Sequence, residues 1–189
     1  MGLPARRQQL GHRARVVTAQ WFPGRGRDAG EDAVLAEIRR QVARSGLADV
    51  GPERTAASVL TDQPLVLTVQ VPGLARVPSR PELQVGLDPE EDTDACLLGA
   101  WETWGWVLDV GTRVLGSPNG RSPAALATSA RRWLEQQLAR PVEHVQWDVR
   151  CGRARSAWRF ADDGELLAQE RGVDRLQRRR PPDRVTRLR

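Results

Sequence analysis

The chain has 189 residues, of which 40% are hydrophobic, and its formal net charge of +5 reflects 29 basic against 24 acidic residues. Its length and apolar content suffice for one domain with a buried core and exclude disorder of the whole chain. No apolar stretch approaches ~18 residues, and no apolar region follows the basic N-terminus, so we expect neither a transmembrane helix nor a secretory signal. The two distant cysteines, Cys96 and Cys151, lack the spacing of a metal or redox site, and we expect a cytoplasmic protein.

The charge is unevenly distributed along the chain. Residues 28–170 hold 22 acidic residues and 15 arginines, whereas residues 1–27 hold six arginines and no acid. Residues 171–189 hold eight arginines and two aspartates, and lysine is absent throughout. An acidic body between basic ends favours interaction over catalysis, because opposite fields act on partner choice and association rate. The predicted parts are a basic tail (1–14), a domain (15–171) and an arginine-rich, disordered tail (172–189).

Hydrophobic periodicity predicts a helix early in the domain. After a candidate strand at residues 15–22 and a Pro-Gly break, apolar residues recur at helical spacing from about residue 30 to residue 44. Acidic residues open this segment, arginines close it, and Gly46 follows as a suitable cap. The residues predicted to form its buried face are Val34, Leu35, Ile38 and Val42.

The residues in the middle of the chain predict strands and one segment whose secondary structure is ambiguous. Residues 65–71 are rich in β-branched side chains and end at a Pro-Gly pair, and apolar residues alternate over 83–87. Residues 88–94 predict an acidic helix N-terminus. Residues 95–115 fit both helical spacing and strand alternation; we favour a helix as far as about Trp104 and leave the remainder open.

The last part of the domain has the clearest pattern. Ser122-Pro123 is a favoured helix start and predicts a helix over residues 122–140. Three alternating segments follow, around residues 145–149, 158–160 and 166–168, and predict an antiparallel meander whose aromatic face packs on that helix. The predicted fold class is α+β, a single domain with about three helices packed on a mostly antiparallel sheet.

A cluster of carboxylates is the main candidate for a binding surface: Asp88, Glu90, Glu91, Asp92 and Asp94. Such a cluster forms a solvated helix start, a contact surface for a basic partner, or a site for a hard cation. Contact is favoured over a metal, because residues 82–109 contain eight acids and no arginine and lack the spacing of a calcium-binding loop. Trp101 and Trp104 lie nearby as interface anchors, or else belong to the core.

Features that carry catalysis or bind cofactors are weak. The glycine-rich loop at residues 24–30 precedes a helix, as a dinucleotide-binding loop does, but its glycines lack that spacing and an ordinary loop is favoured. His12 lies in the N-terminal tail, His144 lies on a strand, and no GxSxG motif occurs. We therefore assign no catalytic, cofactor-binding or metal-binding residues, and an enzyme is disfavoured.

The arginine-rich tails support an alternative interpretation. Arg178, Arg179 and Arg180 form a run that would bind phosphates with salt-dependent affinity and without reading base sequence. The protein would then be a nucleic-acid-associated accessory protein. The same run also fits a tail that only increases solubility.

Two segments resemble a known family. Residues 17–25 contain Trp-Phe-Pro-Gly-Arg before a helix, and residues 122–142 lead into a strand–Asp-Asp-Gly–strand unit. Both are similar to actinobacterial members of the SUKH-type immunity superfamily, although residues 58–65 replace that family's aromatic-Gly-Gly-Leu turn. The resemblance implies a compact α+β protein that neutralises a toxin, often a nuclease, by binding it directly, and it carries over no catalytic residues. We expect a non-enzymatic protein-binding module for a basic partner, such as an immunity-type inhibitor.

Overall fold

The structure is a computed structural model of the chain, and it describes residues 19–59, 65–74, 82–88, 96–102, 110–116, 122–148, 154–169, 173 and 180–189. Within these ranges the fold contains two α-helices, α1 (Ala29–Ser45) and α2 (Pro123–Leu138), and a short 3-10 helix, η1 (Pro52–Arg54). The strands are β1 (Thr55–Val59), β2 (Leu65–Gln70), β3 (Glu82–Asp88), β4 (Cys96–Glu102), β5 (Val110–Gly116), β6 (Val142–Trp147), β7 (Arg155–Phe160), β8 (Leu166–Gln169) and β9 (Arg184–Arg187). The α+β class is confirmed, with two α-helices in the described residues instead of about three.

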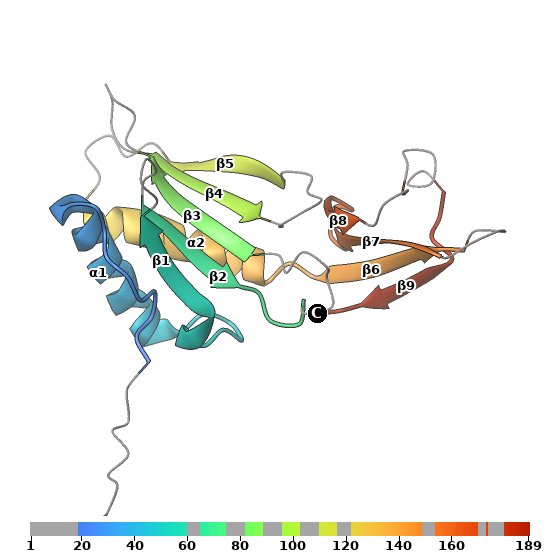
Figure 1. Cartoon of the computed structure of the whole chain (residues 1–189), viewed down its shortest axis with the longest axis horizontal. Helices are drawn as coiled ribbons and strands as arrows, with labels where there is room; N and C mark the ends of the chain where they lie inside the picture. The colour runs from blue at the N-terminus through green and yellow to red at the C-terminus, as the bar shows by residue number, and fades with distance from the viewer. Residues whose placement is uncertain are drawn as a thin grey trace, which may run out of the picture.

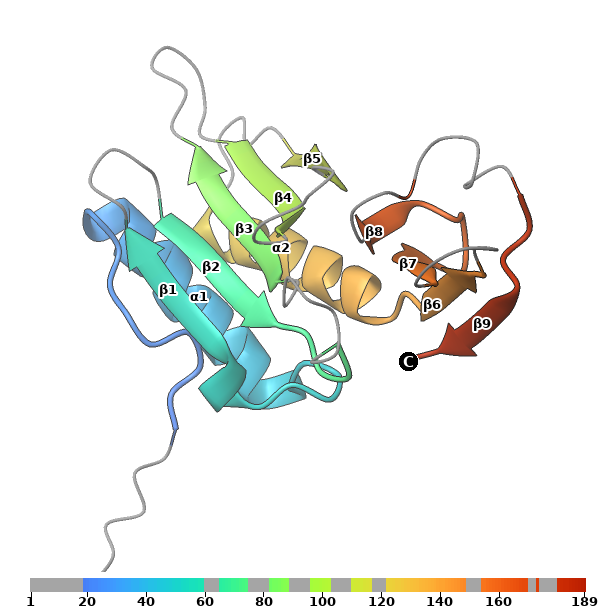
Figure 2. The ribbon, with the colours of Figure 1, turned by 45° about the vertical axis from the view of Figure 1, so that its right-hand side comes forward.

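The strands form two antiparallel sheets where one was predicted. The first contains β1 to β5 in chain order, and the second has the order β8-β7-β6-β9. The two sheets lie next to each other, and α2 extends from the face of the first toward the second (Figures 1 and 2). α1 packs beside α2 on the same face of the first sheet, so both helices cover one side of it.

Helix α1 has the ends that its sequence predicts. The Asp28 side chain accepts a hydrogen bond from the backbone N–H of Glu31, and Gly46, at φ 71°, donates its N–H to the carbonyl of Val42. Both contacts satisfy backbone groups that a helix end leaves unpaired. All four residues predicted for its apolar face are buried: Val34, Leu35, Ile38 and Val42.

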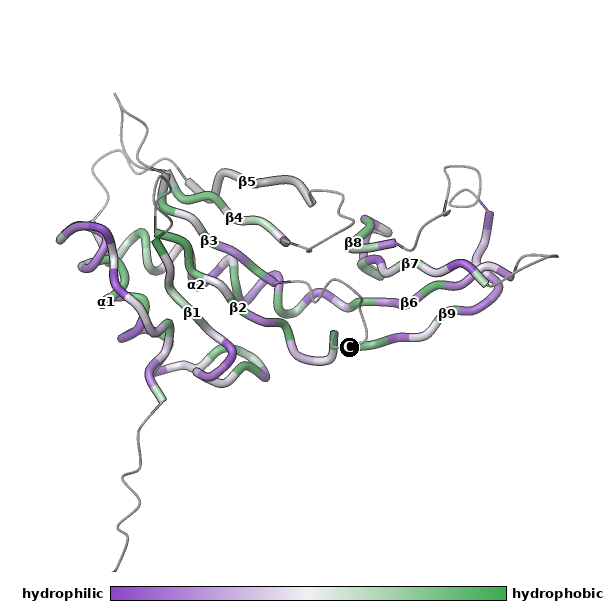
Figure 3. Tube along the Cα trace, viewed as in Figure 1, coloured by the Kyte–Doolittle hydropathy of each residue, from purple (hydrophilic) through white to green (hydrophobic). Residues whose placement is uncertain are grey.

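Helix α2 also begins where predicted. Ser122 is its N-cap, its side chain accepting from the N–H of Ala125, and Pro123 is the first helical residue. The predicted apolar face is buried and consists of Leu126, Ala130, Trp133, Leu134 and Leu138. Figure 3 shows hydrophobic and hydrophilic residues interleaved along both helices, as expected for helices with one buried side.

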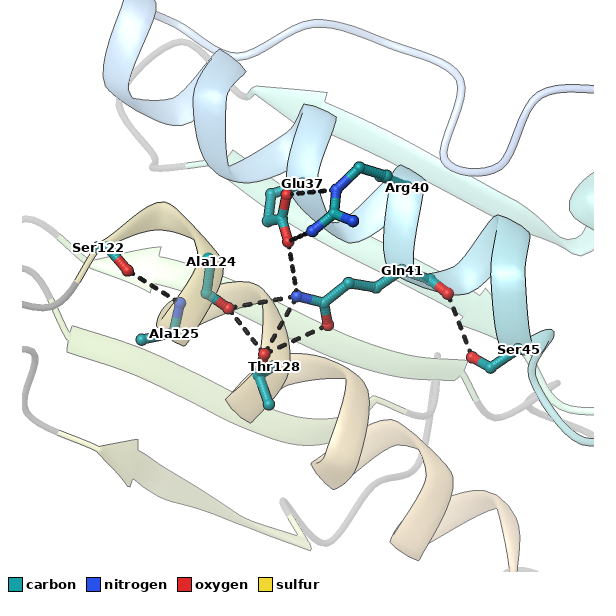
Figure 4. A network of polar contacts seen from close by, with 8 residues as sticks. All are labelled: Glu37, Arg40, Gln41, Ser45, Ser122, Ala124, Ala125 and Thr128. Carbon is teal, nitrogen blue, oxygen red and sulfur yellow. Dashed lines mark hydrogen bonds and ion pairs between the residues drawn. The ribbon is translucent and has the colours of Figure 1, made fainter.

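A polar network joins the two helices (Figure 4). The Gln41 amide nitrogen lies 2.8 Å from a carboxylate oxygen of Glu37 and 3.1 Å from the hydroxyl of Thr128 on α2. Hydrogen bonds from Arg40 and Gln41 lower the pKa of Glu37 from 4.5 to about 2. The Glu37 carboxylate therefore stays ionised down to strongly acidic pH and keeps Gln41 oriented between α1 and α2.

The first sheet is buried on the face that contacts the helices. Alternate residues of β2 are buried, and β3 repeats the pattern, which confirms the strands predicted at 65–71 and 83–87. The buried set on these two strands is Leu65, Leu67, Val69, Leu83, Val85 and Leu87. Pairing such as Leu67 with Val85 places these side chains side by side across the sheet.

The helix predicted to extend to about Trp104 is wrong, because the described part of that segment is strand β4. Asp88, expected at a helix start, instead ends β3 and pairs with Cys96. Leu97 and Trp101 are four residues apart, a spacing that also places both on one face of a strand. Their pairing with β3, as in Leu83 opposite Trp101, decides between the two possibilities, and the sequence pattern alone does not contain that information.

The strand predicted at 15–22 is also wrong over its described residues, 19–22, which belong to no strand. Phe22 is fully buried and has φ 47°, a left-handed conformation that no strand contains. Its N–H donates to the hydroxyl of Thr55 at 2.8 Å, and the Arg39 guanidinium donates to its carbonyl at 2.6 Å. Side chains from α1 and β1 thus replace a strand ladder here.

The second sheet contains the predicted meander β6-β7-β8, and that prediction is confirmed. Trp158 and Phe160 belong to the same buried cluster as the apolar residues of α2. On the other side of the sheet Val145, Trp147 and Ala157 form a separate cluster with Val173. The second sheet is therefore apolar on both faces.

The prediction of a disordered tail over residues 172–189 is wrong for residues 180–189. Strand β9 pairs antiparallel with β6, with Val185 opposite Val145. Leu188 packs against the main cluster, and the Arg189 guanidinium donates to the carbonyl of Leu138 at the end of α2. The arginine-rich composition indicated a solvated segment, and all four residues of β9 are indeed exposed, but its backbone completes the sheet.

Candidate functional site

The acidic segment predicted as a contact surface lies between two paired strands. Asp88 is the last residue of β3, and Cys96, its partner, is the first of β4. Glu90, Glu91, Asp92 and Asp94 lie outside the described residues. The arrowhead of β3 in Figure 2 lies at the end of the first sheet that is farther from β6 to β9. Both ends of the acidic segment are therefore attached to this end of a regular hairpin.

Trp101 is a core residue. It is 3% exposed, and its indole N–H donates to the side-chain oxygen of Gln137 on α2 at 2.8 Å. Its ring meets Phe160 of β7 edge to face, with centroids 5.2 Å apart. Trp101 thus links both sheets to α2 and is not accessible to a partner in this structure, while Trp104 lies outside the described residues.

The glycine-rich loop at residues 24–30 is occupied by the chain's own carboxylates. The N–H of Gly26 donates to Asp32 at 2.8 Å, and the N–H of Arg27 donates to Glu31 at 2.5 Å. In a dinucleotide-binding loop these N–H groups face a phosphate, whose charge the two carboxylates here would repel. Glu31 also accepts from the N–H of Leu65 and so joins the loop to β2. The ordinary-loop interpretation is therefore the one that the geometry supports.

Gly24 has a structural role in the same segment. Its φ is 142°, and a Cβ at this position would lie 2.0 Å from the carbonyl oxygen of Ala57. The neighbouring Pro23 carbonyl accepts from the N–H of Ala57 at 3.0 Å, so this segment covers the outer edge of β1. The glycine is required because two backbones approach closely there.

Replacing Gly24 with alanine should lower the free energy of unfolding by about 2–3 kcal/mol, because the new methyl group must push the loop away from β1. The measurement is equilibrium urea unfolding, with Gly164→Ala as the control. Gly164 also has a positive φ, at 74°, but no atom lies within 4 Å of its added Cβ, so the control reports the conformational cost alone. Equal losses in the two variants would contradict the close approach.

Arg140 is the centre of a polar cluster that the sequence did not reveal. Its guanidinium lies 3.4 Å above the ring of Phe160 and forms ion pairs with Asp162, Asp163 and Glu165. The hydrogen bond from Arg140 lowers the pKa of Asp162. Partial burial opposes the Arg140 cation, but its bonds to the three carboxylates outweigh that cost and raise its pKa. The contacts hold the β7–β8 turn against the end of α2, and only the turn itself was predictable.

The arginine run of the alternative interpretation is described only at Arg180. Its side chain pairs with Asp183 at 2.9 Å, and its carbonyl accepts from the indole N–H of Trp147 at 3.1 Å. Arg178 and Arg179 lie outside the described residues. The arginines exposed nearby are Arg184 and Arg187 of β9, which the sequence analysis placed in a disordered tail.

Groups that could support chemistry are sparse in the described part of the chain. There, no three His, Cys, Asp or Glu side chains are arranged to hold a metal ion. His144 stacks on Trp158 with ring centroids 4.9 Å apart, and it makes a further interaction, so it acts as a packed strand residue. Neither described helix is long and apolar enough to cross a membrane.

Comparisons with known proteins identify no relative of the chain. No family model, no curated protein and no solved structure matches the chain. The resemblance to SUKH-type immunity proteins therefore stays a prediction that rests on residues 17–25 and on the unit that begins at residue 122.

Proposed function

We propose that the protein is a non-enzymatic protein-binding module that contacts a basic partner through its acidic segment, residues 88–94. The observation that carries the proposal is the concentration of charge: residues 82–109 contain eight acids and no arginine. The described residues on both sides of the segment, Asp88 and Cys96, are paired in the β3–β4 hairpin. A regular hairpin therefore supports the acidic segment at both of its ends.

The polar contacts described for the domain support a binding role over a catalytic one. The Arg39 guanidinium holds residues 21–24, the Arg140 cluster holds the β7–β8 turn, and Glu31 joins the glycine-rich loop to β2. Each of these contacts stabilises the fold. The acidic segment differs, because its sequence contains no cation to pair with its carboxylates.

Such a surface acts mainly on the rate of association. A concentrated negative field attracts a basic protein before contact and orients it, and added salt screens the attraction beyond about 8–10 Å. A basic nuclease or toxin is one such partner, and an immunity-type inhibitor is the corresponding specific function. The proposal requires capture that is fast at low ionic strength and slower at high salt.

Reversing the charge of Glu90, Glu91 and Asp92 to lysine should reduce capture of the partner by at least about tenfold, mainly through a slower association rate. The experiment retains partners from nuclease-treated native lysate on wild-type and variant protein, identifies the protein retained, and measures its association rate with each. Removing nucleic acid beforehand separates this proposal from the alternative, in which the retained material is sensitive to nuclease.

Glu91→Lys and Glu53→Lys form a matched pair of single charge reversals. The Glu53 side chain is 67% exposed, and its ion pair with Arg54 is long, at 3.9 Å, so its reversal changes net charge without disturbing the fold. The proposal predicts that Glu91→Lys slows association and that Glu53→Lys has little effect. Affinity that is unchanged in the triple variant would exclude the acidic segment as the contact surface.

A further inference from the structure

Strand β9 ends the second sheet with a free side. In the order β8-β7-β6-β9 it pairs only with β6 among the described strands. The N–H of Leu188 donates to the carbonyl of Val142, and this bond sets the phase of the ladder. Because backbone groups alternate in direction along a strand, Val185 and Arg187 direct their N–H and C=O groups away from β6. These donors and acceptors have no partner strand among the described residues.

The side chains of β9 are exposed as well as its backbone. All four residues of the strand are exposed, and Val185, at 50%, is the exposed large hydrophobic residue of the described chain. The Arg184 side chain is 70% exposed, and its ion-pair contact is a long one to Asp148 at 3.8 Å. Arg187 makes no ion pair within the described residues. The edge therefore combines two exposed arginines with one apolar side chain, although Arg187 also donates its Nε–H to the carbonyl of Arg189 at 3.2 Å.

At the edge of the first sheet, in contrast, strand β1 is covered by another segment of the chain. There the Pro23 carbonyl accepts from the N–H of Ala57 and the Thr55 hydroxyl accepts from the N–H of Phe22, so residues 22–24 cover the strand. Figures 1 and 2 show β9 on the outer margin of the second sheet. Within the described ranges, no backbone hydrogen bond covers the outer edge of β9 as residues 22–24 cover β1.

We propose that the free edge of β9 is a docking edge for an extended acidic segment of a protein partner, which adds to the sheet beside β9. This surface is separate from the acidic segment of the proposed function and requires a partner of opposite charge. Main-chain hydrogen bonds to Val185 and Arg187 would provide affinity, and the side chains would select the sequence. Arg184 and Arg187 would pair with acidic residues, and Val185 with an apolar residue between them.

The charges argue against two other occupants. In an antiparallel pair of β9 strands from two copies, the outward-facing Val185 would lie opposite Val185 or Arg187 of the other copy, and the pairing would bring the arginines of both strands together with no carboxylate on either β9 strand. Arg184 and Arg187 are three positions apart and so lie on opposite faces of the sheet. One phosphate backbone cannot follow both, whereas an added strand also directs alternate side chains to the two faces.

The test uses the full chain and a fluorescent peptide with Glu-Thr-Val-Glu at its centre. Two control peptides accompany it: one N-methylated on the backbone groups that face β9, and one with Lys in place of both Glu. Binding is followed by fluorescence anisotropy at low salt. We expect the acidic peptide to bind at least about tenfold tighter than either control. It alone can both form backbone hydrogen bonds beside β9 and place carboxylates opposite the two arginines.

Charge exchange provides the second measurement. The double variant Arg184→Glu, Arg187→Glu should lose the acidic peptide and gain the lysine peptide, a restoration that a misfolded protein would not show. The variant Val185→Pro removes an N–H that points away from β6, so it should block the peptide while leaving the sheet intact. The triple reversal at residues 90–92 should bind the acidic peptide as the wild type does.

Four results would overturn the proposal. The first is equal binding of the acidic and N-methylated peptides, and the second is failure of the lysine peptide to bind the charge-exchanged variant. The third is tighter binding of single-stranded or duplex DNA than of the acidic peptide under the same conditions. The fourth is a dimer in sedimentation analysis that the acidic peptide does not dissociate, because the edge would then be occupied by a second copy of the chain.

Discussion

Replacing Trp101 with alanine should lower the free energy of unfolding by about 3–5 kcal/mol, the range expected for removing a large buried aromatic side chain. Trp101 is 3% exposed and contacts Phe160 of the second sheet as well as Gln137 of α2. The substitution therefore removes packing at the point where both sheets meet a helix. Urea unfolding followed by far-ultraviolet circular dichroism measures the loss without depending on tryptophan fluorescence.

Two further variants separate packing from hydrogen bonding at this position. Trp101→Phe keeps a ring beside Phe160 but leaves the oxygen of Gln137 without its donor, at a cost of about 1–3 kcal/mol. Combining it with Gln137→Leu removes the unsatisfied oxygen and should recover part of that loss. A Trp101→Ala variant within about 1 kcal/mol of the wild type would mean that Trp101 does not join the two sheets.

Deleting residues 180–189 should destabilise the protein by on the order of 3 kcal/mol and make it associate, even though eight arginines in the last 19 residues suggest a dispensable tail. The deletion removes the β6–β9 ladder and the bonds from the Trp147 indole to Arg180 and from Arg189 to Leu138. It also leaves one edge of β6 without a partner. Thermal unfolding and sedimentation velocity measure the two effects.

The control for this deletion keeps the strand and removes its charge. Arg184→Gln with Arg187→Gln retains β9 and its ladder and should change stability by less than about 0.5 kcal/mol, because both side chains are exposed. A deletion variant that stays monomeric and as stable as the wild type would show that β9 contributes nothing to the sheet. Charge substitution is therefore a better way than truncation to ask what the C-terminal arginines bind.

The parts of the fold that were predictable from sequence are those determined by local signals. α1 and α2 have capping residues at their N-termini and apolar residues at helical spacing, and both begin within one residue of the predicted start. β2 and β3 alternate clearly, and the turn at residues 162–164 separates β7 from β8. In each case the neighbouring residues contain the information that specifies the element.

The elements that were missed depend on contacts between distant residues. β4 contains Leu97 and Trp101, whose spacing of four fits a helix or a strand, and only its pairing with β3 makes it a strand. β9 has a composition typical of a solvated segment, and its pairing with β6 over about forty positions is not a local property. Residues 19–22 have strand-like composition, but Arg39 and Thr55 hold them in another conformation.

The two candidate binding surfaces, the acidic segment and the edge of β9, also differ in whether the sequence alone reveals them. The acidic segment can be recognised from the sequence alone, because its charge follows directly from its residue types. The burial of a side chain cannot be predicted from the sequence so directly. Trp101 is buried in the core, although tryptophans also anchor protein interfaces. The free edge of β9 depends on strand order and on hydrogen-bond phase, which only a three-dimensional structure provides.

The position of β9 in the chain has a consequence for biosynthesis. Among the described elements it is the last to leave the ribosome, whereas its partner β6 emerges with α2 well before it. Until then the nascent chain carries an open strand edge next to Val145 and Trp147, an arrangement that favours pairing with other chains. Completion of the second sheet is therefore a late, long-range step, and we expect the yield of native protein to depend on how quickly translation of the last residues follows that of β6.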